Sequence, residues 1–112
     1  MRVVYIAHPV KGDTAANIAR AKRWLLWAAQ HRDVSPVAPW IAAVEAVGGD
    51  ASGEERELWL ARDCAVVERC DELWLCGSHV SDGMRRELGA AMAAGVFVRD
   101  MTTPDGEPKE HT

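Results

Sequence analysis

Apolar residues along the chain follow two spacings in turn. Short runs rich in valine, isoleucine, tyrosine and tryptophan are typical of buried strands, and apolar residues every three or four positions are typical of helices that bury one face. The predicted strands are 2–7, 34–38, 72–76 and 96–99; the predicted helices run from Asp13 or Thr14 to about 31, over 41–47, from 52 or 53 to about 70, and over 82–95. This alternation predicts an α/β fold, a small flavodoxin-like or Rossmann-like open parallel sheet of four or five strands with helices on both faces.

Three local features refine this pattern. Pro36 interrupts the second strand, and because proline cannot donate to the ladder, it favours an edge strand or a bulge. The loop 48–53 between two helices is where a site could be lidded or left open. From Thr102 the chain is polar and contains two prolines, which predicts a domain over 1–101 followed by a flexible, frayed polar tail over 102–112.

Length and composition exclude several classes. A chain of 112 residues with 48% hydrophobic content is long enough for one compact core and too short for a separate substrate domain. The net charge of -4 argues against a nucleic-acid partner. No apolar run approaches a membrane span, and the amino terminus leads directly into a strand rather than a signal peptide, so we expect no membrane partner and a cytoplasmic location.

The cysteine and histidine positions predict no metal site. Cys64, Cys70 and Cys76 are odd in number, and their spacing matches no common zinc or redox pattern, so we expect reduced structural thiols. No set of histidine, cysteine and aspartate has the spacing of metal ligands. His79 lies in a loop, and the sequence assigns it no role.

Two carboxylates stand on predicted helices without a local cation. Neither Glu87 nor Asp63 has a lysine or arginine three or four residues away, and apolar residues surround both. Buried charge without a partner is costly and concentrates at functional sites. Two structural alternatives stay open: Asp63 could bond a backbone amide in a neighbouring loop, and Glu87 could pair with a distant arginine or lysine.

The turn before Glu87 has the features of an anion site. Ser81 or Asp82 can cap the helix, and Gly83 would let the backbone approach a ligand beside the positive end of the helix dipole. Such a turn is more often only a cap. A second glycine turn at Lys11 and Gly12 follows the first strand and could face it, because ligands in these sheets bind beyond the carboxyl ends of the strands.

Several motifs together resemble one known family. They occur in the same order and with similar spacing, and they span nearly the whole domain up to about Val98. The motifs are Tyr5-Ile6-Ala7-His8-Pro9-Val10-Lys11-Gly12, Arg62-Asp63, Cys70-Asp71-Glu72-Leu73-Trp74-Leu75, and Ser81-x-Gly83-x-x-x-Glu87-Leu88-Gly89-x-Ala91. This pattern resembles the nucleoside 2-deoxyribosyltransferase family.

The resemblance implies cleavage of an N-glycosidic bond in a nucleoside or nucleotide, without a cofactor. By this resemblance Glu87 attacks C1' of the sugar, Asp63 contacts the base or sugar and assists proton transfer, and Tyr5 holds the nucleophile. A carboxylate can trap the oxocarbenium-like centre left when the base departs, and a second protonated group helps the base leave. We expect the helix dipole to keep Glu87 ionised, as a nucleophile requires.

Two positions favour the branch of 2'-deoxynucleoside 5'-phosphate N-hydrolases. That branch carries serine where the nucleoside transferases carry aspartate, and this chain has Ser81; Lys11 falls where the branch has a basic residue. His8 and Pro9 depart from the small residues common in that loop and could touch the substrate, although His8 could equally cap backbone groups. Arg85 and Arg86 also depart from the pattern and could bind phosphate, bind a partner chain, or be solvated.

Two competing interpretations remain. The chain could be a non-catalytic nucleotide-binding module, or an interaction domain whose carboxylates pair with arginines.

We also expect a homodimer or higher homo-oligomer. The resemblance implies that a neighbouring subunit completes each site, and Trp24, Trp27 and Trp59 supply more apolar surface than so small a domain readily buries.

Overall fold

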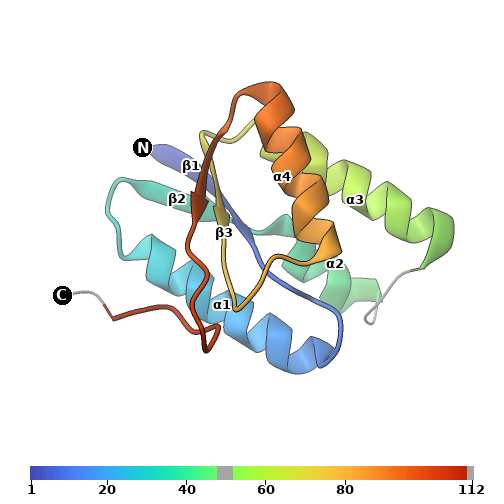
Figure 1. Ribbon diagram of the computed structural model, residues 1–112, viewed down its shortest axis with the longest axis horizontal. Helices are drawn as coiled ribbons and strands as arrows, with labels where there is room; N and C mark the ends of the chain where they lie inside the picture. Colours follow the sequence, from blue (N-terminus) through green and yellow to red (C-terminus); the bar gives the residue numbers. More distant parts are fainter. Residues whose placement is uncertain (48–51, 111–112) are drawn as a thin grey trace.

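The computed structural model describes residues 1–47 and 52–110 and contains four strands and four helices in these segments (Figure 1). In chain order they are β1 (Arg2–Ala7), α1 (Thr14–Ala29), β2 (Val34–Val37), α2 (Pro39–Val47), α3 (Gly53–Val67), β3 (Glu72–Leu75), α4 (Asp82–Ala94) and β4 (Phe97–Asp100). Most of the loop predicted at 48–53 lies outside the described residues. Every predicted element is present, and α3 ends at Val67, earlier than predicted. Beyond it, Asp71 accepts a hydrogen bond from the backbone of Val3 on β1.

The four strands form one parallel sheet in the order β2-β1-β3-β4. The predicted α/β fold is therefore confirmed and is consistent with a small Rossmann-like or flavodoxin-like domain. β2 is an edge strand, as Pro36 predicted, and Pro36 lies opposite Val4 of β1. The central strands β1 and β3 carry the longest buried runs, as expected for strands covered on both faces.

Alternate residues of the central strands feed two separate cores. Val4 and Ile6 pack with Trp24 and Ala28 of α1, and Tyr5 packs with residues of α3 and α4. This separation follows from the two-residue period of a strand. Figure 1 shows α1 on one side of the sheet and α3 and α4 on the other. Connections that cross on opposite faces leave a crevice beyond the carboxyl ends of β1 and β3, where the two directions of winding meet.

Gly77 brings the loops after β1 and β3 into close contact. Its φ is +94°, and a Cβ atom there would lie 2.8 Å from Cδ of Pro9 and 3.1 Å from the ring of His8. A side chain at position 77 would therefore strain the backbone and collide with the neighbouring loop. The glycine fixes His8 at the edge of the crevice.

The segment after β4 differs from the frayed tail predicted from Thr102 onward. Thr103 is buried and its backbone donates to Gly77, and the carbonyl of Gly106 accepts a hydrogen bond of 2.8 Å from Nε1 of Trp24. Glu107 pairs with Arg20 and Arg23 of α1. Polar composition misled the prediction, because these polar groups satisfy partners on α1 and on the loop after β3.

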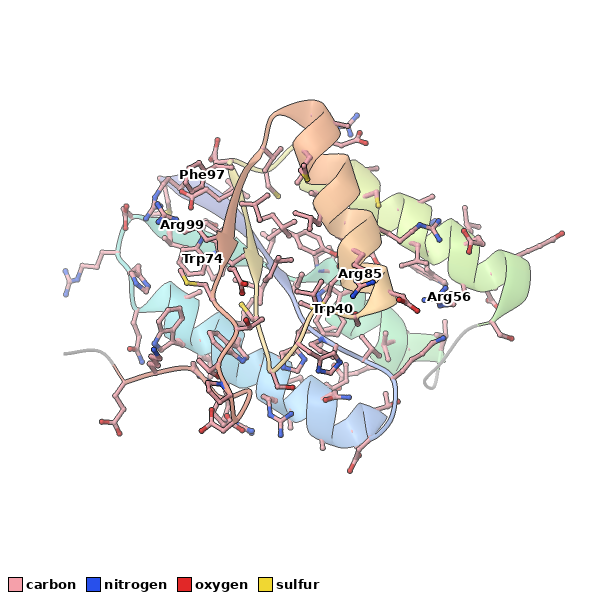
Figure 2. All side chains as sticks on the ribbon, in the orientation of Figure 1. Trp40, Arg56, Trp74, Arg85, Phe97 and Arg99 are labelled. Atoms are coloured by element: carbon pink, nitrogen blue, oxygen red, sulfur yellow. The ribbon has the colours of Figure 1, made fainter. Side chains whose placement is uncertain are left out.

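Glu72 ties three strands together at the amino end of the sheet. Its buried carboxylate accepts hydrogen bonds from Arg2 of β1, Trp74 of β3 and Arg99 of β4. Figure 2 shows Arg99 and Trp74 at this end of the molecule. Burial alone would raise the pKa of Glu72, but the bonds from Trp74 and the two arginines outweigh it and hold the pKa at about 2. The carboxylate is therefore ionised and structural.

No helix in the described segments is long and apolar enough to cross a membrane.

Candidate functional site

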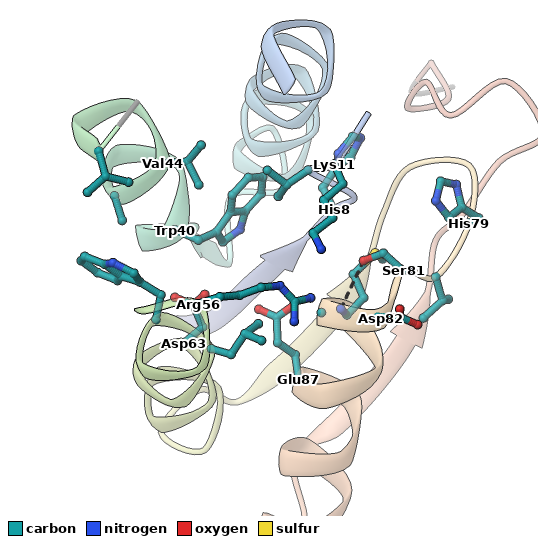
Figure 3. A pocket seen from close by; sticks show the side chains of 18 residues that line it. His8, Lys11, Trp40, Val44, Arg56, Asp63, His79, Ser81, Asp82 and Glu87 are labelled. Atoms are coloured by element: carbon teal, nitrogen blue, oxygen red, sulfur yellow. Dashed lines mark hydrogen bonds between the residues drawn. The ribbon is translucent and has the colours of Figure 1, made fainter. Parts of the chain in front are cut away.

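A cavity of about 460 Å³ opens beyond the carboxyl ends of β1 and β3 (Figure 3). Four segments line it: the loop after β1, α2, α3, and the loop after β3 with the first turns of α4. One part of the wall is apolar and comes from α2 and α3, and it includes Trp40, Val44, Trp59 and Leu60. The remaining wall carries ionisable and polar groups. This combination suits a ligand that has one apolar end and one charged end.

Most of the residues predicted from the sequence meet in this cavity. Those that line it are His8, Lys11, Asp63, Ser81, Gly83 and Glu87. Tyr5, Pro9 and Gly12 are outside the lining. Tyr5 is part of the core, Pro9 faces Gly77, and Gly12 forms a turn at φ +100° with no atom within 4 Å of its Cβ position. A direct substrate contact is therefore not supported for Pro9 and Gly12 by the described geometry, whereas Tyr5 was predicted to hold the nucleophile and not to contact the substrate.

Glu87 is buried, at 6% exposure, and forms no ion pair with any described residue. Burial raises the pKa of its carboxyl to about 8, the nearby hydroxyl of Tyr5 acts against this effect, and the negative charge of Asp63 adds to it. The helix dipole was expected to keep Glu87 ionised, and the raised pKa does not support this expectation. Glu87 is the sixth residue of α4, and the dipole effect fades within the first turn, so burial dominates.

Tyr5 lies in the core, close to Glu87. Its side chain is fully buried, and its hydroxyl has no partner of regular hydrogen-bond geometry among the described residues, although the Glu87 carboxyl is close enough to affect it. Burial and, after it, the charge of Glu87 raise the pKa of Tyr5, so the hydroxyl keeps its proton. It can therefore donate that proton to a carboxylate at position 87.

Asp63 faces the same cavity from α3. Burial raises the pKa of its carboxyl to about 6. Asp63 forms no hydrogen bond or ion pair with the described residues, so the alternative of a brace to a backbone amide finds no support in these segments. The two carboxyl groups thus come from different helices, share one cavity and have elevated pKa values. Such pairs are a common basis of acid and base chemistry.

Ser81 caps α4 as the sequence predicted. Its hydroxyl oxygen accepts a hydrogen bond of 3.3 Å from the backbone of Met84, and the Met84 sulfur accepts one from the backbone of Ser81. The Ser81 hydroxyl proton stays available for a ligand. Gly83 lies inside the helix without a positive φ, and a Cβ there would be in ordinary contact with Leu60 at 3.5 Å. Its backbone conformation therefore does not require glycine.

His8 is buried at the edge of the cavity, and one of its two ring nitrogens forms a hydrogen bond. Nδ1 lies 2.7 Å from the carbonyl oxygen of Pro9, which assigns the proton to Nδ1 as the donor. Nε2 has no partner among the described residues. Burial is the main reason that the pKa of His8 is lowered, so the ring is neutral. Nε2 is itself buried and lies next to Gly77.

A family model described as a domain of unknown function, DUF7768, matches residues 2–101. The chain belongs to the DUF7768 family. A comparison with curated proteins found no match. The matched region of this DUF7768 domain contains all the lining residues of the cavity and ends one residue after β4.

Sequence reasoning missed several residues of the DUF7768 site. Arg56 and Trp59 line the cavity together with Asp63. Arg56 is seven residues before Asp63 and Trp59 is four residues before it, so the three side chains lie on one face of α3. Extending the helical spacing from Asp63 by one further turn would have identified Arg56. Trp40 is fixed in the wall by a hydrogen bond of 2.8 Å from its Nε1 to the carbonyl of Ile6. His79, to which no role was assigned, also lines the cavity.

The two arginines on α4 lie outside the cavity lining. Arg86 forms a bidentate pair with Glu57 of α3, with a closest distance of 2.6 Å, so it joins α3 to α4. Arg85 is exposed (Figure 2).

Among the described residues of the DUF7768 domain, no group of three or more histidine, cysteine, aspartate or glutamate residues is arranged to hold a metal ion.

Proposed function

We propose that this protein cleaves the N-glycosidic bond of a nucleoside 5'-monophosphate, as a hydrolase or by deoxyribosyl transfer, with Glu87 as the nucleophile. The observation that supports this most is the meeting of Glu87 and Asp63 in one cavity without an ion-pair partner among the described residues. A buried carboxyl such as Glu87 and a half-buried one such as Asp63 lower stability when no cation compensates them, and a catalytic use explains their presence.

The proposed reaction has two steps. An oxygen of ionised Glu87 bonds to C1' while the C1'–N bond breaks, and the electron pair of that bond leaves with the base, which takes a proton from Asp63. Water then attacks C1', the ester bond to Glu87 breaks, and Asp63 takes the proton of the water. The products are a free base and a sugar 5'-phosphate. In deoxyribosyl transfer, a second base replaces the water.

The same pair predicts which protonation state is active. The first step needs an ionised Glu87 and a protonated Asp63, which is one proton shared by the two carboxyls. With pKa values raised to about 6 for Asp63 and about 8 for Glu87, the pair holds one proton between these two values. Because the pKa of Glu87 is the higher of the two, that proton favours Glu87. The active form is therefore the minor arrangement until the positive charge that develops at C1' favours an ionised Glu87.

The proposed phosphate site lies at the amino end of α4. Backbone amides there, the free hydroxyl proton of Ser81 and the ammonium of Lys11 are the groups that would bind it. His8 forms part of the cavity wall beside these groups, and its buried Nε2 lies next to Gly77. The chemistry uses no cofactor.

One observation favours a second candidate, a non-catalytic nucleotide-binding module. A pKa of about 8 leaves Glu87 mostly neutral near pH 7, and a neutral carboxyl can donate a hydrogen bond to a base but is a poor nucleophile. The two candidates predict the same binding and differ in whether free base is released.

Replacement of Glu87 separates the two candidates. Incubation with the four 2'-deoxynucleoside 5'-monophosphates, followed by chromatographic detection of free base, should give turnover for the wild type and a loss of at least about 10³-fold for Glu87→Ala. Glu57→Ala is the control, because Glu57 is exposed and pairs with Arg86 outside the cavity. Substantial turnover in Glu87→Ala would overturn the nucleophile assignment, and nucleotide binding without base release by the wild type would favour the binding module.

A further inference from the structure

Arg56 is a half-buried guanidinium of α3 that lines the cavity and forms no ion pair with a described residue. Other arginines of the chain do pair with carboxylates, namely Arg2, Arg20, Arg23, Arg86 and Arg99. Glu57, its neighbour in the sequence, is already engaged by Arg86. Figure 3 shows the Arg56 side chain extending across the cavity toward the side that holds Glu87 and the start of α4.

The acidic groups of the cavity, together with a bound phosphate, would require a cation in addition to Lys11. A phosphate monoester brings between about -1.5 and -2 of charge near pH 7. The proposed phosphate end already contains a carboxylate, because Asp82 is the first residue of α4 and also lines the cavity, and Asp63 adds a second acidic group. The permanent cations in the described lining are Lys11 and Arg56. One exposed ammonium and the helix dipole must otherwise offset the phosphate, Asp82 and the single negative charge of the Glu87–Asp63 pair.

We propose that Arg56 binds the phosphate of the substrate and determines the preference of the cavity for nucleoside monophosphates over nucleosides. This inference rests on the proposed function and adds a residue from α3 to the phosphate site. A guanidinium can present two parallel N–H donors to two phosphate oxygens, which an ammonium cannot, so Arg56 supplies direction as well as charge. Its position on the same helix face as Asp63 would couple phosphate binding to the placement of the sugar.

The test measures binding constants by calorimetry for the four 2'-deoxynucleoside 5'-monophosphates, their nucleosides and inorganic phosphate. Arg56→Gln should weaken monophosphate binding by about 10- to 100-fold, because a charged hydrogen-bonded contact contributes that much, and should leave nucleoside binding within about twofold. Arg56→Lys keeps the charge and loses the paired donors, so it should lie between. Arg32→Gln is the matched control, since Arg32 is exposed and outside the cavity. Weaker binding of inorganic phosphate by Arg56→Gln would show that the phosphate alone is recognised.

Each contrary result has a distinct meaning. If the wild type prefers monophosphates and both Arg56 variants match it, Arg56 is a solvated side chain and this inference alone is wrong. Equal losses for monophosphate and nucleoside would assign Arg56 to the shape of the cavity and also overturn the inference. A wild type that binds no nucleotide, or that does not distinguish a monophosphate from its nucleoside, would overturn the proposed phosphate site together with the role of Arg56.

Discussion

Glu87 illustrates how burial competes with helix electrostatics at a single residue. Its carboxyl is too far along α4 for the dipole to offset the loss of water, and the hydroxyl of Tyr5 compensates only in part. The sequence correctly marked Glu87 as a residue without a helical partner. It could not reveal the balance between burial and the dipole, because that balance depends on Tyr5 and Asp63, which other elements bring close.

The first prediction concerns the pH dependence of stability at this residue. The pKa of Glu87 rises from 4.5 in the unfolded chain to about 8 in the folded protein, so the folded state holds the proton more tightly. The contribution of Glu87 to the free energy of unfolding is therefore fully present below about pH 4.5 and is lost as the pH rises through 8. Glu87→Gln cannot ionise, so it should have a higher melting temperature than the wild type at about pH 8 and a smaller advantage at about pH 5. Thermal unfolding at both pH values measures this, with exposed Glu55→Gln as the control. An advantage independent of pH would contradict it.

A second prediction concerns Ser81. Aspartate and asparagine both cap helices well, so Ser81→Asp and Ser81→Asn should keep α4 and differ mainly in charge. Ser81→Asp should weaken monophosphate binding by about 10- to 150-fold, corresponding to the loss of a charged contact, and should affect nucleoside binding much less. Ser81→Asn should bind both ligands nearly as the wild type does. Titration with a monophosphate and its nucleoside would reject the phosphate site if Ser81→Asp weakened both equally.

At the scale of elements, the position of the cavity was predictable and its full lining was not. The rule for parallel sheets places ligands beyond the carboxyl ends of the strands, and the loops after β1 and β3 do meet there. The apolar wall from α2 was missed because Trp40 faces the cavity through its fit against β1, a long-range contact. The docked segment after β4 was missed for the same reason, since Gly106 is tied to Trp24 of α1.

The third prediction concerns the network that joins β1, β3 and β4. Glu72→Gln should lower the free energy of unfolding by about 1–3 kcal/mol, less than for a fully buried ion pair because Arg2 and Arg99 are 35% and 45% exposed. The lowered pKa of Glu72 means that its contribution is present above about pH 4.5 and is lost as the pH falls toward 2. Denaturant unfolding near neutral pH measures the loss. Asp33→Asn is the control, because Asp33 forms an exposed pair with Arg2, and it should change the free energy of unfolding by less than about 0.5 kcal/mol. A similar loss in both variants would contradict the role of Glu72.

At the scale of the whole molecule, the argument for an oligomer changes. Trp24 was expected to add exposed apolar surface, and this is wrong because the segment around Gly106 covers it, whereas Trp27 and Trp59 are half-buried. Met92 and Phe97 are instead exposed, at 69% and 58%, on the neighbouring elements α4 and β4. We still predict a homodimer or higher oligomer. Light scattering at working concentration should give at least twice the chain mass of 12.3 kDa, and a single 12.3 kDa species would refute it.

The central claim is that Glu87 and Asp63 form one catalytic pair, and the pH dependence of base release tests it most directly. The rate of free-base formation from a 2'-deoxynucleoside 5'-monophosphate should give a bell-shaped kcat/KM profile for the wild type. Its limbs should lie near the pKa values of about 6 and about 8, because the pair carries a single proton between them. Asp63→Asn should lose most of the rate and the basic limb, because the limb that remains reports the ionisation of Glu87. The absence of released base from every monophosphate and nucleoside across about pH 5 to 9 would contradict the account.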